Sequence, residues 1–306
     1  MFYRTIVTDS KEPSAMKTAV RLRPWLLGLL VLLLGVLALL FILRPKSDPH
    51  AGQVYLYDGF DWIWYTPLEG VEVNPWTEES FDTSGAAPVY RGTDYATRRG
   101  IDVSEHQHEI DWRQVAASGV DYAYIRLGRR GYTEGGLFED PFFTRNFQGA
   151  SDAGLDVGVY FFSQAVSVQE AIEEADFVLA RLRGHTVHLP VVYDWEKITE
   201  PDARTLDVTA EVRTQCAIAF CETVKNAGYT PCVYFNRNLG YYGYDLSRLT
   251  DYEFWFALPE ASYPSFYYAV DSWQYSFTET VPGIDYATDM SLRFEALPAG
   301  AGNTEE

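Results

Sequence analysis

Leu189-Pro190-Val191-Val192-Tyr193-Asp194-Trp195-Glu196 predicts a short buried strand that ends in two carboxylates. Side chains alternate along a strand, so Asp194 and Glu196 share one face and Trp195 takes the other. A rise of ~3.3 Å per residue sets their Cα atoms about 6.6 Å apart. Two carboxyl groups at that spacing can flank one bond of a bound substrate.

The surroundings of these acids suggest separate roles. If Asp194 is ionised, its charge disfavours ionisation of Glu196, and the neighbouring Tyr193 and Trp195 displace the water that would solvate a carboxylate. Glu196 is therefore the candidate for a protonated acid. Two carboxyls with separated pKa values suit glycoside hydrolysis, in which one protonates the leaving oxygen and the other stabilises or attacks the sugar cation. By itself, Asp-x-Glu also occurs on solvated strand ends and in cation sites.

Strand-like and helix-like segments alternate around this stretch. The expected strands are 101–104, 122–127, 157–162, 189–193, 231–235, 254–258, 272–275 and a short segment near Asp289. The expected helices are 112–118, 141–153, 168–182 and 208–227, of which the first is capped by Asp111. Eight strands with helices only in the first half predict an α/β fold, an irregular TIM-like (β/α) barrel. The carboxyl ends of its strands, where Asp102 and Asp194 lie, are where such barrels carry their chemistry.

Asp102 and Asp289 are two further candidate acids. Alternation in Gly100-Ile-Asp-Val-Ser104 places Asp102 and Ser104 on one face, and an acid inside a barrel needs a partner or a purpose. Pairing with Arg126 or capping of the next turn is the alternative for Asp102. Asp289 by itself fits an ordinary turn.

Two other residue patterns bear on the site. His106 and His108 lie close to Asp102, but two histidines at i and i+2 without a third spaced ligand do not make a metal site, so no metal or other cofactor is expected. The aromatic residues expected near the same end of the barrel form either a sugar platform or part of the core: Tyr160, Tyr234, Trp255 and Trp273.

The amino-acid composition narrows the range of possible functions. The formal net charge is -19 and the sequence pI is about 4.6, which argues against nucleic-acid binding. Aromatic residues make up 16% of the chain, a surplus that suits stacking against sugar rings as well as a core.

An unbroken apolar stretch, 25–43, predicts one transmembrane helix. As a helix it reaches roughly 28 Å, close to the ~30 Å hydrocarbon thickness of a bilayer. The basic residues before it indicate a cytoplasmic N-terminus, with everything after Pro45 outside the cell; they are Arg4, Lys11, Lys17, Arg21 and Arg23. A cleaved signal peptide is the competing interpretation, but no small-x-small site follows Leu43. A start at Met16 leaves this topology unchanged.

The expected organisation is a cytoplasmic tail (1–24), the transmembrane helix (25–43), an extracellular spacer (44–96), a catalytic domain (97–296) and a C-terminal tail (297–306). Within the spacer, 54–58 and 62–65 form a possible β-hairpin that either packs on the domain or touches the cell wall; packing is favoured. Three cysteines cannot all pair internally. Cys216 and Cys221 are too far apart on one helix, either one can meet Cys232, and free thiols are favoured.

Taken together, the motifs resemble the glycoside hydrolase family 25 lysozymes, the muramidases also called the Chalaropsis type. They run in family order over about 98–294 and are Gly100-Ile-Asp-Val-Ser104 with Gln107, Ile110-Asp-Trp112, Tyr124-Ile-Arg126, Gly131-Tyr132, Asp140, Gly158-Val-Tyr-Phe-Phe-Ser163, Pro190-Val-Val-Tyr-Asp-Trp-Glu196, Trp273-Gln-Tyr275 and Asp289. The combination is specific, although no single piece is.

The resemblance implies a flattened barrel that cleaves the β-1,4 bond between N-acetylmuramic acid and N-acetylglucosamine in peptidoglycan, without a cofactor. It maps the catalytic acid onto Glu196, its companion onto Asp194, and two further acids of the groove onto Asp102 and Asp289. Expected sugar contacts are Gln107, Arg126, Tyr160, Phe162, Tyr234, Trp255 and Trp273. Members act with retention, and the nucleophile is either the aspartate or the substrate's own acetamido group.

Two positions depart from the family pattern. Ser291 stands where many members carry Asn, and Trp255-Phe-Ala257 leads into Leu258-Pro259 rather than a tyrosine. Neither departure touches the acid pair. The sequence therefore predicts a membrane-anchored, outward-facing muramidase, with a non-catalytic wall-binding tether and a metal-dependent glycan deacetylase as rivals.

Overall fold

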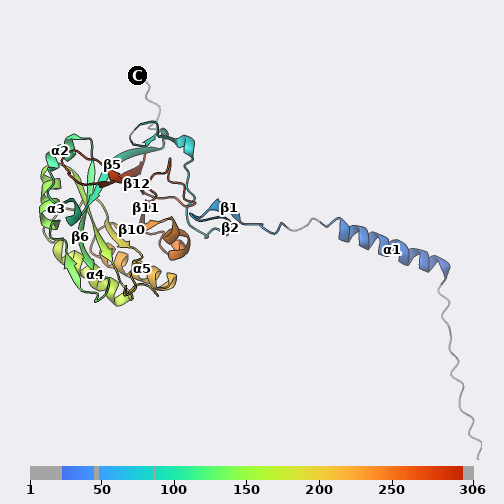
Figure 1. The fold of residues 1–306 in the computed structure, drawn as a ribbon. Coiled ribbons are helices and arrows are strands. Elements are labelled where there is room, and N and C mark those ends of the chain that lie inside the picture. Colours follow the sequence, from blue (N-terminus) through green and yellow to red (C-terminus); the bar gives the residue numbers. More distant parts are fainter. Residues whose placement is uncertain (1–22, 45–47, 86, 299–306) are drawn as a thin grey trace, which may run out of the picture. The chain divides into compact units, whose positions relative to one another are not determined.

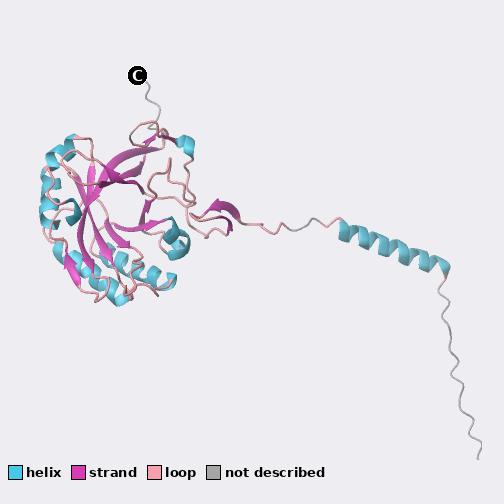
Figure 2. Cartoon of the chain, in the orientation of Figure 1, coloured by secondary structure: helices cyan, strands magenta, loops and turns pink. Residues whose placement is uncertain are grey.

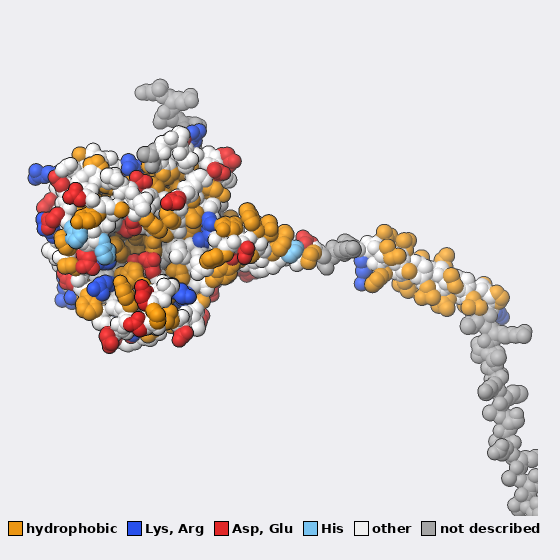
Figure 3. Space-filling model, in the orientation of Figure 1, with side chains coloured by type: hydrophobic (Ala, Val, Ile, Leu, Met, Phe, Trp, Pro, Cys, Tyr) orange, Lys and Arg blue, Asp and Glu red, His pale blue; other side chains and the backbone are white. Residues whose placement is uncertain are grey.

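The computed structural model describes residues 23–44, 48–85 and 87–298, in two compact units, 1–51 and 52–306 (Figure 1). The first unit contains helix α1 (Pro24–Ile42), whose mean hydropathy is 3.0 and whose residues are all exposed. Figure 3 shows it covered with hydrophobic side chains. Among the described residues, α1 is the one helix that is long and apolar enough to cross a membrane. The basic residues of 1–22 and the tail beyond 298 lie outside the described ranges.

The second unit is built on a closed β-barrel (Figure 1). Nine strands form its sheet within the described residues, and eight of them close into a ring. In order around the ring they are β5 (Tyr95–Val103), β6 (Tyr122–Arg130), β8 (Asp156–Ser163), β9 (Val191–Trp195), β10 (Pro231–Asn236), β11 (Glu253–Ala257), β12 (Ser272–Glu279) and β13 (Thr288–Ala296). The ninth, β7 (Leu137–Glu139), pairs with the end of β6. The predicted eight-stranded barrel is confirmed.

The TIM-like alternation of strands and helices is not confirmed. The helices that cover the barrel follow its first four strands and lie along one side of it (Figure 2); they are α2 (Trp112–Ala117), α3 (Phe143–Asp152), α4 (Val168–Arg181) and α5 (Ala210–Asn226). Between β10 and residue 298, the helical elements are the single turns η3 (Leu239–Gly243) and η4 (Leu246–Arg248). The last strand, β13, runs antiparallel to both β12 and β5, because it follows β12 without a crossover helix.

Side-chain alternation divides the barrel into an inner and an outer layer. On β9, Val191, Tyr193 and Trp195 pack outward into the main core, whereas Val192 and Asp194 point inward. Aromatic side chains fill the lower part of the barrel interior, chiefly Tyr122, Tyr124, Tyr234 and Trp255. Tyr124 and Trp255 stack with ring centroids 4.7 Å apart. This aromatic layer is the floor on which the acids rest.

Much of the expected spacer, 44–96, lies in the same compact unit as the barrel, which begins at Gly52. Trp76 and Phe81 are buried in the main core, and the Trp76 ring lies 4.0 Å from that of Phe294 on β13. Apolar burial of two large aromatic side chains holds this segment on the barrel. It also contains the short elements η1 (Glu78–Ser80), β3 (Phe81–Asp82) and β4 (Val89–Tyr90).

The predicted hairpin is present as β1 (Val54–Tyr57) and β2 (Trp62–Tyr65), with its turn at 58–61. One face packs on the barrel: the Tyr65 ring lies 5.1 Å from that of Tyr241, and its hydroxyl is 3.0 Å from that of Tyr268. The other face exposes Tyr55 and Trp62, and hydrophobic side chains gather over this segment in Figure 3. Packing of the hairpin on the domain, the favoured alternative, is what the structure has.

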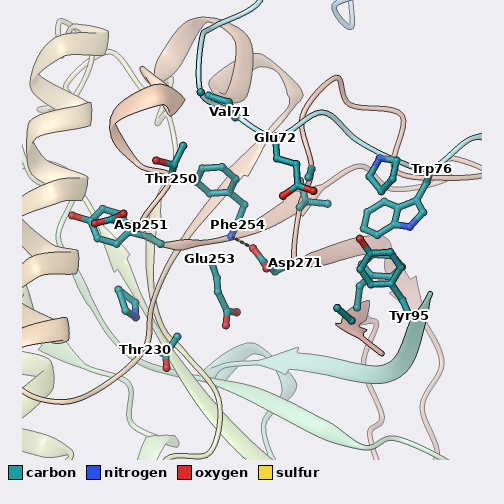
Figure 4. Close-up of a pocket in the computed structure, with 18 residues that line it drawn as sticks. Val71, Glu72, Trp76, Tyr95, Thr230, Thr250, Asp251, Glu253, Phe254 and Asp271 are labelled. Atoms are coloured by element: carbon teal, nitrogen blue, oxygen red, sulfur yellow. Dashed lines mark hydrogen bonds between the residues drawn. The ribbon is translucent and has the colours of Figure 1, made fainter. Parts of the chain in front are cut away.

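A hollow of about 660 Å³ lies at the amino-terminal mouth of the barrel, away from the acids (Figure 4). Its polar groups are occupied by the fold: Asp271 accepts a hydrogen bond from the Phe254 backbone N–H at 2.7 Å, and Glu253 pairs with Arg293 at 2.6 Å. Both of these acids thus have partners within the fold.

Candidate active site

β9 positions the predicted acid pair. Asp194 is the inward residue next to the end of the strand, and Glu196 follows directly after it, half-buried at the rim. Trp195 points to the opposite side, where its Nε1–H donates to the Ala165 carbonyl at 3.3 Å and the Arg213 guanidinium lies 4.1 Å from its ring centroid. Fixing Trp195 in this way fixes the direction of both carboxyls.

Four carboxyl groups line one cavity of about 410 Å³ at the carboxyl end of the strands. They are Asp102, Asp194, Glu196 and Asp289, from the first, fourth and last strands of the ring. Figure 3 shows a hollow on this unit in which acidic and hydrophobic side chains meet. The structure thus brings together all four acids that the sequence singled out.

Asp102 and Asp289 are direct partners across β5 and β13. Their carboxyls are hydrogen-bonded to each other, which requires a shared proton. The Gln274 amide donates to Asp102 at 2.8 Å and to Asp289 at 3.2 Å, while its oxygen accepts from the Tyr234 hydroxyl at 2.7 Å. Gln274 therefore uses both ends of its side chain to hold this pair against Tyr234.

Burial and mutual repulsion raise the pKa values of the whole cluster. Burial raises the pKa of Glu196, and burial with the charge of Glu196 raises that of Asp194 well above its usual range. Burial and the Asp289 charge do the same to Asp102, and burial raises the pKa of Asp289 to about 7. The cluster therefore keeps protons at a pH where exposed carboxyls have lost them.

The expected contrast between an ionised Asp194 and a protonated Glu196 is weaker than predicted, because Asp194 is the more deeply buried of the two. The positive charge of Arg126 opposes this effect and lowers the pKa of Asp194. Among the described residues no group bonds to Asp194 Oδ1, although this atom is buried. Asp194 thus has an oxygen available to a substrate inside the cavity.

Arg126 pairs with acids other than Asp102. Its Nε–H donates to Asp140 at 2.7 Å and its terminal nitrogen to Glu105 at 2.8 Å. Asp140 also accepts the Glu105 backbone N–H at 2.9 Å, so this network fixes the turn η2 (Glu105–Gln107) beside the cavity. The alternative pairing of Arg126 with Asp102 is wrong.

Gln107 lines the cavity, but its amide group is hydrogen-bonded to backbone groups of the protein. Its oxygen accepts from the Ser104 backbone N–H at 2.9 Å, and its NH₂ donates to the Ala287 carbonyl at 3.1 Å. It therefore ties η2 to the segment that leads into Asp289. His106 also lines the cavity, whereas the His108 ring lies 4.8 Å from that of Tyr286.

Four of the five predicted aromatic contacts line the cavity: Tyr160, Phe162, Tyr234 and Trp255. Trp273 does not. It is fully buried on the outer face of β12, donates to the Leu258 carbonyl at 2.9 Å and packs against Phe81. Alternation explains the correction, because Gln274 is the inward residue of the Trp-Gln pair.

Sequence reasoning missed two glutamines. Gln274 holds the Asp102–Asp289 pair, and a polar residue in a buried strand was its only signal. Gln164 is fully buried and donates to the Glu196 carbonyl at 2.9 Å, while its oxygen accepts from Thr205 at 3.0 Å. It positions the backbone of the proposed acid and lies just past the end of β8, where no pattern marked it.

The structure also shows the surroundings of the three cysteines and of Ser291. Cys216, Cys221 and Cys232 are buried free thiols. Ser291, one of the departures from the family pattern, accepts a hydrogen bond from Trp255 Nε1–H at 3.1 Å. The serine thus holds the tryptophan in the aromatic floor.

Comparison with known proteins gives a matching family model and several similar proteins. The family model described as glycosyl hydrolases family 25 matches residues 101–284. The chain is 27% identical over 204 residues to the autolytic lysozyme of Clostridium acetobutylicum. This match covers 66% of this chain and 57% of that protein. It is 29% identical over 136 residues to lysozyme M1 of Streptomyces globisporus, covering 44% of this chain and 38% of that protein. The chain thus spans little more than half the length of the clostridial relative.

A solved structure shares the fold. The modular autolysin LytC from Streptococcus pneumoniae, in complex with a synthetic peptidoglycan ligand, superposes with a TM-score of 0.58 at 24% identity. The match covers 65% of this chain and 47% of that one. At this identity the likeness concerns the fold alone.

Proposed function

The chain belongs to glycosyl hydrolases family 25, and from this we propose that it is a membrane-anchored muramidase that cleaves the β-1,4 bond after N-acetylmuramic acid in peptidoglycan. The observation that carries the proposal is the cluster of four carboxyls in one cavity floored by aromatic side chains. A groove of this composition suits a neutral sugar polymer, with apolar ring faces against the floor and hydroxyl groups against the acids.

Glu196 is the proposed general acid. Burial raises its pKa, and its place at the rim lets it reach the oxygen of a glycosidic bond that lies across the cavity. The Gln164 amide holds its backbone, so the carboxyl projects from a fixed point. Protonation of the leaving oxygen allows the bond to break as positive charge develops on the sugar.

Asp194 acts on the other side of the reacting carbon. With its free Oδ1 in the cavity, it either attacks the sugar cation or orients and stabilises the substrate's acetamido group as that group attacks. Arg126 favours its carboxylate form. The Asp102–Asp289 pair adds negative potential beside the same centre, which stabilises the developing cation.

Helix α1 supports an anchor with the barrel unit outside the cell, facing the wall. The helix has the length and composition of a single span, and basic residues precede it. An enzyme tethered in this way acts on the glycan strands nearest the membrane.

The test is mass spectrometry of fragments that the full chain, in detergent micelles, releases from purified Gram-positive peptidoglycan after borohydride reduction. Reduced muramic acid ends are expected, and Glu196→Gln lowers their release by about 10²–10⁴-fold while circular dichroism and Tm stay unchanged. Reduced glucosamine ends would move the cut to the other bond. Tight wall binding without release of fragments would make the chain a tether.

A further inference from the structure

A second cavity, of about 350 Å³, continues from the acid cavity toward the β1–β2 hairpin. Three residues line both cavities: Glu196, Tyr234 and Phe277. The tip of the β1–β2 hairpin, at Gly59 and Phe60, forms part of its wall. This hairpin precedes residues 101–284, so it lies outside the part of the chain that matches the family model.

The hairpin tip is held in place by the barrel. Asp58 Oδ1 accepts the backbone N–H groups of Phe60 and Asp61 at 2.8 and 2.9 Å, which fixes the turn. The Tyr242 hydroxyl, on η3, donates to the other oxygen of Asp58. Gly59 has a φ of +110°, and a Cβ there would meet the Arg237 side chain at 3.3 Å, so the turn lies directly on that arginine.

This anchoring leaves Phe60 exposed at the cavity. Its side chain is 71% exposed, and that of Phe277, from β12, is 41% exposed. The cavity is also lined by the exposed amides Asn236 and Asn238. Apolar ring surface beside polar amides matches a pyranose ring, which has C–H faces and hydroxyl edges.

We propose that the hairpin tip forms an additional sugar-binding subsite, in which Phe60 stacks on an N-acetylhexosamine one unit further along the glycan strand than the unit held by the acids. The proposal rests on the proposed function. Continuity carries it, because a linear polymer whose bond lies at Glu196 must leave the acid cavity, and this cavity opens from the same residue. Phe60 thereby favours longer glycans over the shortest substrate.

The test compares kcat/KM of the full chain in detergent on peptide-free glycan oligosaccharides of two, three and four disaccharide units. In the wild type, kcat/KM rises with length as the subsite fills. Phe60→Ala removes about three- to tenfold of that rise. Phe60→Tyr keeps the ring and keeps the rise.

Trp62→Ala is the matched control, since Trp62 is a 62% exposed aromatic on the same hairpin that does not line this cavity. Its length dependence should equal that of the wild type. A Phe60→Ala enzyme with the wild-type length dependence would overturn the proposal. So would a deficit that appears only when stem peptides are left on the glycan, because a peptide would then be the occupant.

Failure of the proposed function gives a different result, namely no cleavage of any oligosaccharide by the wild type. The subsite is tested in that event by fluorescence titration of the same oligosaccharides against Glu196→Gln, with and without Phe60→Ala. Equal affinities for the longest glycan would reject the subsite, and about three- to tenfold weaker binding without Phe60 would support it.

Discussion

Asp102 and Asp289 stand opposite each other on the first and last strands of the barrel, hydrogen-bonded to one another and held by the same Gln274 amide. Directly opposed residues of neighbouring strands have Cβ atoms within about 5.5 Å, so two charges there repel strongly. The pair therefore acts as a store of one proton next to the proposed acid. Its protonation state sets the potential that Glu196 and Asp194 experience.

Asp289→Asn should move the alkaline limb of the pH profile of kcat/KM to lower pH. Burial and the charge of Glu196 raise the pKa of Asp289 to about 7. Because repulsion between two carboxylates is mutual, an ionised Asp289 opposes ionisation of Glu196 in the same way. Asparagine removes that charge, so Glu196 loses its proton earlier, by about half a pH unit or more. Asp285→Asn, an exposed acid in the preceding segment, is the control. An unshifted limb in Asp289→Asn would disconnect this acid from Glu196.

The same variant should be more stable than the wild type at alkaline pH. The folded pKa of Asp289 is about 7, against an ordinary value of 3.8, so the folded state binds this proton more tightly than the unfolded state. The free energy of unfolding therefore falls as pH rises from about 4 to 7. Asparagine avoids this loss, and a gain of about 1–2 kcal/mol is expected at pH 8 but not at pH 4. Thermal unfolding of both proteins at pH 4 and pH 8 measures this gain. If the Tm difference between variant and wild type were the same at both pH values, the proton of Asp289 would not be linked to stability.

Gln274→Leu should destabilise the fold and lower activity together. It leaves the buried Tyr234 hydroxyl without its acceptor and the acid pair without its donor, at a cost of about 1–3 kcal/mol. Adding Tyr234→Phe removes the orphaned hydroxyl, so the double variant should recover part of the lost stability. Strictly additive losses in urea unfolding would show that the bond between the two side chains contributes nothing.

Arg126→Lys should cost about 1–2 kcal/mol and slow hydrolysis, because a single ammonium group cannot serve Asp140 and Glu105 with the geometry of a guanidinium. The turn that carries Gln107 then loosens beside the cavity. Arg145→Lys is the matched control, since Arg145 pairs with Glu109 at a largely exposed site and should change little. Chemical denaturation and kcat/KM are the two measurements. Equal effects of both substitutions would remove the special role of the Arg126 network.

Local patterns were sufficient to predict much of the barrel and the acids. Alternation along 189–196 correctly separated Asp194 from Trp195, and the same rule placed Asp102 inside. Helices α2 to α5 begin and end within a few residues of the predicted bounds, since caps and glycine stops are encoded next to the helix itself. Composition and length were enough for α1.

Long-range pairing determined what the sequence did not reveal. The antiparallel direction of β13 depends on its partners β12 and β5, not on its own residues. Gln274 points into the barrel and Trp273 points outward, because only one face of β12 is turned toward the barrel axis. From the sequence alone, tryptophan was the more attractive candidate for a sugar contact. The segment 70–81 has a spacer-like composition, yet its two buried aromatic side chains, Trp76 and Phe81, pack into the barrel core.

Closure of the ring by β13 also has a consequence for the timing of folding. Eight residue pairs join β13 to β5. The barrel strand that is synthesised first therefore cannot complete its pairing until the last strand has been synthesised. Contacts of such high sequence separation form late, after the loop between them has been closed at an entropic cost. The proton-sharing acid pair cannot assemble until β13 has left the ribosome. A nascent chain therefore carries no complete acid cluster until synthesis of the barrel is finished.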